Sequence, residues 1–410
     1  MDNQTMHRTA AALAPHQPED PQNPGGFAHV PALDGIRGLA ILLILFCHLF
    51  WSNPDTGSRL FDLLNEIRAS SYIGVNLFFV LSGFLITGIL LDTLHVPHFF
   101  KTFYARRALR IFPLYYGSLI FLLLLTRPLH FTWSGWQYYY FTYTANLALW
   151  RTHPMILGHF NINHFWSLQV EEQFYLVWPF LVFRVKRPQT IVRISLLTCL
   201  AILIIRIALL VFRSHYANIY IAYSPTFSCA DNLLFGCALC AILRTSARQR
   251  VLQLAPRIFA LGAAILLIAA VLHHGLIWET SFFITTLGFS IIGITAAALV
   301  AMVLRPASIT QRLFENPTMR FFGKYSYGLY VFHYSLQGML SAPVREFIDV
   351  HLHSKVLAVI GGACVVLAAS ILISLLSYHF YEAPFLKLKR YFSYNREATS
   401  PRQSQAAIAG

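Results

Sequence analysis

Ten long apolar runs constrain the fold of this chain more than any other feature. Each approaches the roughly 20 residues that cross a bilayer as a helix, and they begin near Leu33, Tyr72, Ile111, Phe165, Ile194, Ser228, Ile258, Phe282, Phe322 and Val356. Charged residues make up only 12% of the chain, against about 25% in soluble domains. The sequence therefore predicts an all-α, polytopic membrane protein with about ten transmembrane helices.

The positive charges between the apolar runs predict the direction in which each helix crosses the membrane. If the N-terminus is cytoplasmic and ten helices cross, the loops rich in Lys and Arg all lie in the cytoplasm, where such loops are usually found. Both termini are then expected in the cytoplasm. Residues 133–150, rich in Trp and Tyr, are interpreted as an interfacial or re-entrant segment, because an extra crossing there would reverse every later loop.

One membrane domain is expected over residues 31–390, with a disordered tail at 1–30 and a polar tail at 391–410. The first tail lacks the apolar segment of a signal peptide. The net charge of +14 does not indicate a nucleic-acid partner, because the basic residues lie in short loops rather than on a basic arm. Cys237 and Cys240 form a CxxC pair without a second pair or a histidine cluster, so no metal site is expected.

Arg37 and His48 place two ionisable groups in the first apolar run. Eleven residues rotate a helix by about 1100°, close to three full turns, and advance it by about 16 Å. The two side chains therefore share a face, with Arg37 near the cytoplasmic surface and His48 beyond the membrane midplane. Arg37 could be a membrane anchor and His48 a helix-packing residue, but ionisable residues within a membrane are functional candidates.

Glu171 and Glu172 are expected at the depth of His48, since their run enters from the outer side. Adjacent residues on a helix project about 100° apart, so at most one of the two carboxylates can face His48. Ser167 precedes Glu171 by one turn and could line the same pocket. The alternative is that both glutamates pair with cationic side chains and that Ser167 serves helix packing.

Three further residues are candidates for a substrate pocket. Tyr330 and His333 lie on a polar stripe in the segment GKYSYGLYVFHYSL, and Asp231 lies just inside the run that begins near Ser228. Hydrogen bonds between helices explain such residues equally well.

Arg107 and Arg110 lie three residues apart at the start of another run, on one helix face. Paired guanidinium groups suit bidentate binding of phosphate, although the usual excess of positive charge in cytoplasmic loops also explains them. Together with Arg37, His48 and the carboxylates, they describe a path for a long phosphorylated carrier that ends at a general base.

Five motifs in order resemble the acyltransferase family 3 of integral membrane acyltransferases, which modify sugars and other hydroxyl-bearing acceptors. They are LDGIRGLAILLILFCH, GVNLFFVLSGFLITGILL, RRALRIFPLYY, HFWSLQVEEQFYLVWPF and SYGLYVFH. The family's motif of an arginine and a histidine separated by ten residues matches Arg37 and His48, and its RxxR motif matches Arg107 and Arg110. The resemblance implies a cytoplasmic acyl-CoA donor and a catalytic histidine. Relatives often carry an acid where this chain has Asn76, so a carboxylate role is absent there.

The resulting hypothesis is a membrane O-acyltransferase in the bacterial plasma membrane. It would move a short acyl group, acetyl in the first instance, from acyl-CoA to a hydroxyl of a carbohydrate or glycolipid, with membrane lipid around it and no permanently bound cofactor. His48 would be the general base or a transient acyl carrier, and Glu171 or Glu172 would orient its ring. Arg37, Arg107 and Arg110 would hold CoA. The alternatives are a transporter of sugar or anion and a non-catalytic protein that binds acyl-CoA or lipid.

Overall fold

The computed structural model describes residues 30–50, 59–126, 128, 135–148, 156–157, 160–212, 221–275 and 281–394. This part of the chain is predominantly helical, with one small antiparallel sheet of β1 (Ile156–Leu157) and β2 (Phe160–Asn161). Most of the two expected tails lies outside the described residues.

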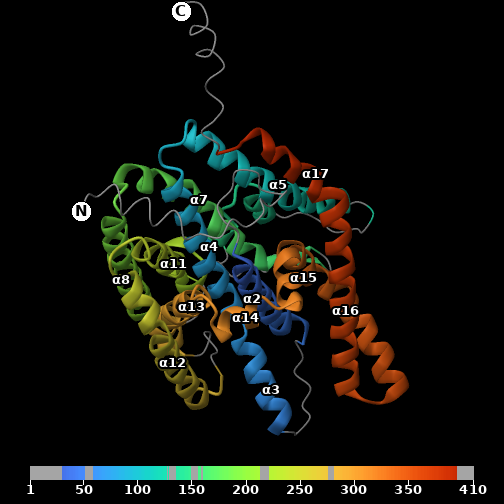
Figure 1. Ribbon diagram of the computed structural model, residues 1–410. Helices are drawn as coiled ribbons and strands as arrows, with labels where there is room; N and C mark the ends of the chain where they lie inside the picture. Colours follow the sequence, from blue (N-terminus) through green and yellow to red (C-terminus); the bar gives the residue numbers. More distant parts are fainter. Residues whose placement is uncertain are drawn as a thin grey trace, which may run out of the picture.

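The main helices form one bundle (Figure 1). They are α2 (Pro31–Leu49), α4 (Ile73–Asp92), α5 (Phe99–Leu124), α7 (Trp166–Val185), α8 (Pro188–Phe212), α11 (Asp231–Ile242), α12 (Arg248–Leu272), α13 (Phe289–Val303), α15 (Pro317–Leu352) and α16 (Lys355–Leu376). Shorter elements connect or extend them: α3 (Arg59–Ser70), η1 (Gly135–Tyr140), α6 (Ala145–Ala148), η3 (Asn163–Phe165), α10 (Thr226–Cys229), η4 (Ile284–Gly288), α14 (Ile309–Phe314), η5 (Ser377–Glu382), α17 (Ala383–Lys387) and η6 (Leu388–Tyr391).

The all-α membrane fold is confirmed. Seven helical segments of the described chain are long and apolar enough to cross a membrane. Helices α7 and α15, with 20 and 36 residues, are long enough but carry more polar side chains, and α11 is a shorter apolar helix. The count of about ten crossings and the cytoplasmic position of both termini stay predictions.

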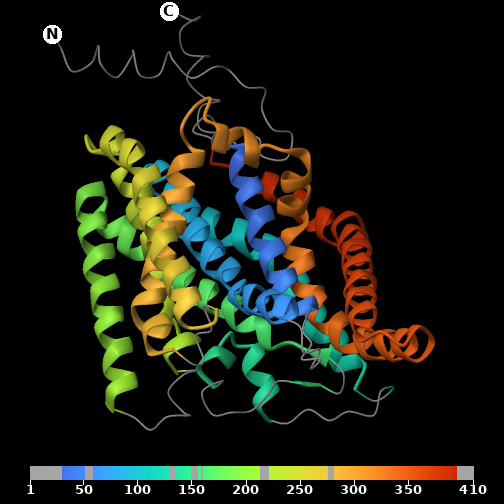
Figure 2. The same cartoon turned by 90° about the horizontal axis from the view of Figure 1, so that it is seen from below.

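Residues 133–150 contain no membrane-spanning helix in their described part. That part forms only η1 and α6, which lie with neighbouring loops at one end of the bundle (teal to green in Figure 2). Tyr115 of α5 donates a hydrogen bond to the Tyr140 carbonyl at 2.8 Å, and Gln169 of α7 accepts one from the Asn146 N–H at 2.6 Å. The segment is therefore fastened to α5 and α7, while its depth in the membrane stays a prediction.

The direction of crossing can be tested directly. A reporter fused after Lys186, between α7 and α8, is expected to read as cytoplasmic, because the basic residues around it favour that side. Alkaline phosphatase and a cytoplasmically fluorescent protein at this position give opposite signals for the two orientations. Strong phosphatase activity there would contradict the predicted topology.

Helices α2 and α15 pack backbone against backbone at their first turns. A Cβ atom on Gly38 would lie 2.0 Å from the Met319 carbonyl oxygen, and one on Gly323 would lie 1.9 Å from that of Asp34. Only glycine permits this approach. The two helices run parallel from this contact, so His48, ten residues past Gly38, meets His333, ten residues past Gly323.

Candidate active site

A cavity between α2, α4, α5, α7 and α15 collects most of the predicted site residues. Its empty volume, including the open mouth, is about 900 Å³. Seven of the predicted residues line it: Arg37, Arg107, Arg110, Ser167, Glu171, Glu172 and Tyr330. His48, His333 and Asp231 are not among the lining residues. The cavity therefore brings together the predicted phosphate-binding arginines and the predicted carboxylates, but it does not include the predicted base.

The arginines at the cavity differ in how they are held. Arg37 pairs with Asp34 of its own helix at 2.5 Å. The Arg107 guanidinium lies 5.1 Å from the centre of the Tyr175 ring, a cation–π contact. Within the described chain, neither Arg107 nor Arg110 has a carboxylate oxygen within 4.0 Å. Both guanidinium groups can therefore accept an anionic ligand without first breaking an ion pair.

The two glutamates belong to the cavity wall. Glu171 interacts with the hydroxyl groups of Ser82 and Tyr175, which also hydrogen-bond to each other. Glu172 has a buried carboxylate oxygen without a hydrogen-bond partner among the described residues.

Among the described residues, no hydrogen bond or ion pair joins Glu171 or Glu172 to His48, so the prediction that one of them orients the His48 ring gains no support. The helical rise predicted their depth, but their direction depends on which helices surround α7. They project into the cavity, whereas His48 points toward α15 and pairs with His333.

His48 and His333 form a hydrogen-bonded pair whose proton positions follow from the neighbouring atoms. The Nδ1 atom of His48 lies 2.8 Å from Nε2 of His333, and Nδ1 of His333 lies 2.9 Å from the carbonyl oxygens of Leu329 and Tyr330. Carbonyl oxygens only accept, so His333 carries its proton on Nδ1 and its Nε2 must accept from His48. His48 Nε2 is then left as an unprotonated nitrogen, which is the form that a general base requires.

His164 lies beside this pair and was not predicted from the sequence to be a site residue. Its ring centre is 5.0 Å from that of His333, and both of its ring nitrogens are buried. Its place at the start of the motif HFWSLQVEEQF, three residues before Ser167, was a signal for it. Tyr334, stacked on His48 with ring centres 4.4 Å apart, was also missed.

A hydroxyl pair lies between the cavity and the histidines. The Ser167 hydroxyl is 2.5 Å from the Tyr330 hydroxyl, which donates to the His164 carbonyl at 2.6 Å. Both residues line the cavity, and the Tyr330 ring also packs against those of His164 and His333. Ser167 and Tyr330 therefore form the boundary between the cavity and the histidine cluster.

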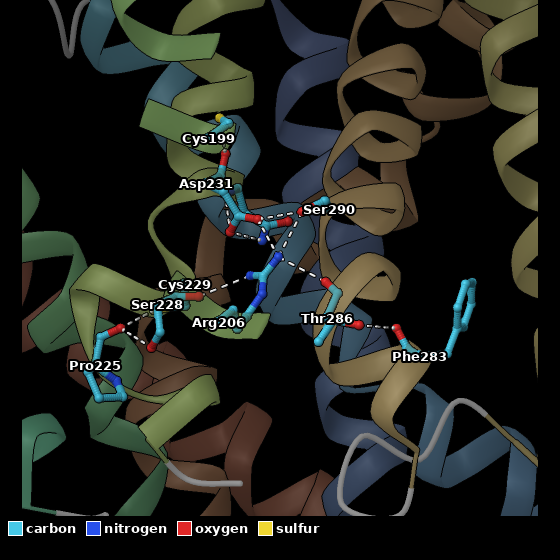
Figure 3. Close-up of polar contacts among 10 residues, drawn as sticks. Cys199, Arg206, Pro225, Ser228, Cys229, Asp231, Phe283, Thr286 and Ser290 are labelled. Atoms are coloured by element: carbon cyan, nitrogen blue, oxygen red, sulfur yellow. Dashed lines mark hydrogen bonds and ion pairs between the residues drawn. The ribbon is translucent and has the colours of Figure 1, made fainter. Parts of the chain in front are cut away.

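Asp231, a predicted pocket residue, does not line this cavity. Its carboxylate pairs with Arg206 of α8 at 2.9 Å, and both side chains are fully buried (Figure 3). Arg206 also donates to the carbonyls of Ser228 and Thr286, each at 3.0 Å, and to the Ser290 hydroxyl at 2.7 Å. Asp231 therefore serves to join helices. The missed signal was Arg206 itself, a charged residue in an apolar run, which needs a buried partner.

The predicted absence of a metal site concerned Cys237 and Cys240, which are both buried in α11. The described residues contain no group of three or more His, Cys, Asp or Glu side chains that could hold a metal ion.

Comparisons with known proteins place these features in a family. The chain is 29% identical over 388 residues to YrhL of Bacillus subtilis (strain 168), provisionally named a peptidoglycan O-acetyltransferase. It is 27% identical over 384 residues to the peptidoglycan O-acetyltransferase OatA of Listeria monocytogenes. The alignments cover 90% and 88% of this chain but 56% of each relative. The chain thus spans little more than half the length of these relatives.

No solved structure is significantly similar to the chain. The acyltransferase domain family matches residues 30–379, a range that includes both arginine motifs, the cavity and all three histidines. The seven apolar helical segments of the described chain agree with a multi-pass integral membrane protein. The chain therefore belongs to acyltransferase family 3.

Proposed function

We propose that this protein moves a short acyl group, acetyl in the first instance, from cytoplasmic acyl-CoA to a carbohydrate hydroxyl. The observation that carries the proposal is a cavity with a histidine cluster behind its Ser167–Tyr330 boundary. Its wall contains Arg107 and Arg110, which have no ion-pair partner among the described residues. The names of the relatives support a cell-wall glycan as the acceptor. The bacterial plasma membrane is the location that this acceptor and a cytoplasmic donor require.

The donor would lie along α2. Arg107 and Arg110 would bind its phosphate groups through charge-assisted hydrogen bonds, with Arg37 contacting its polar groups. The helical rise from Arg37 to His48 is about 16 Å, the order of length of an extended pantetheine arm. The thioester would then pass the Ser167–Tyr330 boundary to reach His48.

The chemistry proposed for His48 is general base catalysis. Its Nε2 takes the proton from the acceptor hydroxyl as the oxygen attacks the acyl carbon, and the thioester C–S bond breaks. The proton then passes to the departing thiolate. His333 accepts the Nδ1–H hydrogen bond and so keeps the ring in the reactive tautomer. A transient acyl group on Nε2 is the alternative route and requires the same tautomer. Glu171 and Glu172 are assigned to the wall of the donor cavity.

Donor binding can be separated from chemistry through the arginines. Replacing Arg107 or Arg110 by alanine should weaken CoA binding about 10-fold or more, since charged hydrogen bonds contribute about 1.5 to 3 kcal/mol each. Acyl transfer at saturating acetyl-CoA should survive in part. Calorimetry with CoA and mass analysis of the acylated product, on the same purified variants, measure the two effects.

Lys101→Ala is the matched control for the arginine variants, because Lys101 is an exposed cation on the same helix. It should leave CoA affinity unchanged. Equal CoA affinity in the wild type and in both arginine variants would contradict the proposed donor site.

A further inference from the structure

The segment that follows α16 folds back across the start of α5. It comprises η5, α17, η6 and residues up to 394, and α17 lies against α5 in Figure 1. Arg106 of α5 donates to the carbonyls of Lys389 and Phe392 at 3.2 and 2.9 Å. Tyr381 donates to the Pro113 carbonyl at 3.0 Å. These contacts fix the segment beside the helix turn that carries Arg107 and Arg110.

Lys389 is the least exposed of the three basic residues in this part of the segment. It is half-buried and within electrostatic reach of Arg110, Arg107 and Arg37. Its neighbours Lys387 and Arg390 are exposed instead. The preference of basic residues for the cytoplasmic side explains all three charges, but it does not explain why Lys389 is partly buried near other cations.

Lys389, Arg107 and Arg110 together form a cationic cluster on which carboxylates act only from a distance: Glu382 and Asp34 on Arg110, and Glu171 and Glu172 on Arg107. In the described part of the chain, none of the three has a carboxylate oxygen within 4.0 Å. Bringing like charges together out of water costs free energy unless an anion joins them. Three converging cations on two separate segments fit an anion with several charges better than a single carboxylate.

We propose that Lys389 is a further ligand for the phosphate groups of the acyl donor. The inference rests on the proposed function, because it assigns the phosphates of that donor to Lys389, Arg107 and Arg110. Lys389 reaches the donor from the C-terminal segment, whereas the arginines reach it from α5. The phosphate chemistry could also come from an anionic lipid headgroup, and the experiment distinguishes these sources.

The test compares Lys389→Met with Lys387→Met in nanodiscs of neutral lipid. Methionine removes the charge and keeps an unbranched apolar side chain, and Lys387 is an exposed cation two residues away. Binding is measured for CoA, dephospho-CoA and pantetheine. Lys389→Met should weaken CoA binding roughly 10-fold, and Lys387→Met should not. Pantetheine, which has no phosphate, should bind all variants equally, and Lys389→Arg should retain CoA affinity.

These measurements distinguish failure of this inference from failure of the proposed function. If the wild type binds CoA and Arg107→Ala weakens it, but Lys389→Met and Lys387→Met bind CoA equally, this inference is overturned and the proposed function stands. If the wild type binds no CoA, the proposed donor itself is wrong. If native mass spectrometry finds phosphatidylglycerol lost from Lys389→Met while CoA affinity is unchanged, the cations bind a lipid headgroup and the inference is also overturned.

Discussion

Replacing His48 by alanine is expected to lower acyl transfer about 10²- to 10⁴-fold, the usual cost of losing a general base. A larger loss would follow if the histidine carries the acyl group. CoA affinity should change little, because His48 does not line the cavity where Arg107 and Arg110 lie. Product mass and calorimetry on one purified sample separate the two effects. His351→Ala, which removes an exposed histidine of α15, is the control.

The hydrogen bond between His48 and His333 provides a second test of this prediction. His333→Ala removes the acceptor of the His48 Nδ1–H bond, so the reactive tautomer loses its support and turnover should fall while the KM for the donor changes little. His333→Gln offers a carbonyl oxygen at a similar reach and should restore part of the turnover. Near-normal transfer by His48→Ala would make His48 a helix-packing residue. Equal loss in the Ala and Gln variants of His333 would assign His333 a packing role only.

The position of residues along each helix was predictable, whereas the direction of side chains around the bundle was not. The 3.6-residue period placed Arg37 and His48 on one face, and α2 carries both. The same rise predicts that Glu171 and Glu172 lie near the depth of His48. However, only the packing of α2 on α15 decides that His48 meets His333 rather than a carboxylate. That packing depends on backbone contacts at Gly38 and Gly323, which lie on helices far apart in the sequence.

A buried charge can be recognised in the sequence, but its partner on another helix cannot. Asp231 was recognised as a polar residue within an apolar run, but its role depends on Arg206, which lies on a different helix and was overlooked. A fully buried charge must be paired, so each of the two residues predicts that a partner exists without identifying it. The place of Lys389 beside the arginines was not predicted, because the segment that carries it is fixed by contacts with α5 that the sequence does not reveal.

The second large effect is expected on stability, at the Arg206–Asp231 pair. Arg206→Ala should lower the free energy of unfolding by about 3 to 5 kcal/mol, because it leaves the fully buried Asp231 carboxylate without its cation. The Arg206→Met, Asp231→Leu double variant should be less destabilised than Arg206→Ala, since apolar residues of similar volume often replace a buried ion pair at little cost. A denaturant titration of each purified variant in detergent measures both free energies of unfolding.

Arg193→Ala is the matched control, because Arg193 is an exposed cation on the same helix, α8, and its loss should change the free energy of unfolding by less than about 0.5 kcal/mol. The folded fraction of Arg206→Ala should bind CoA with wild-type affinity, because neither Arg206 nor Asp231 lines the cavity. Destabilisation no larger than that of Arg193→Ala would mean that the pair contributes little to the fold. A loss of CoA affinity in the folded fraction would instead indicate that Asp231 contributes to donor binding. The hydrogen-bond network in Figure 3 would then influence the cavity.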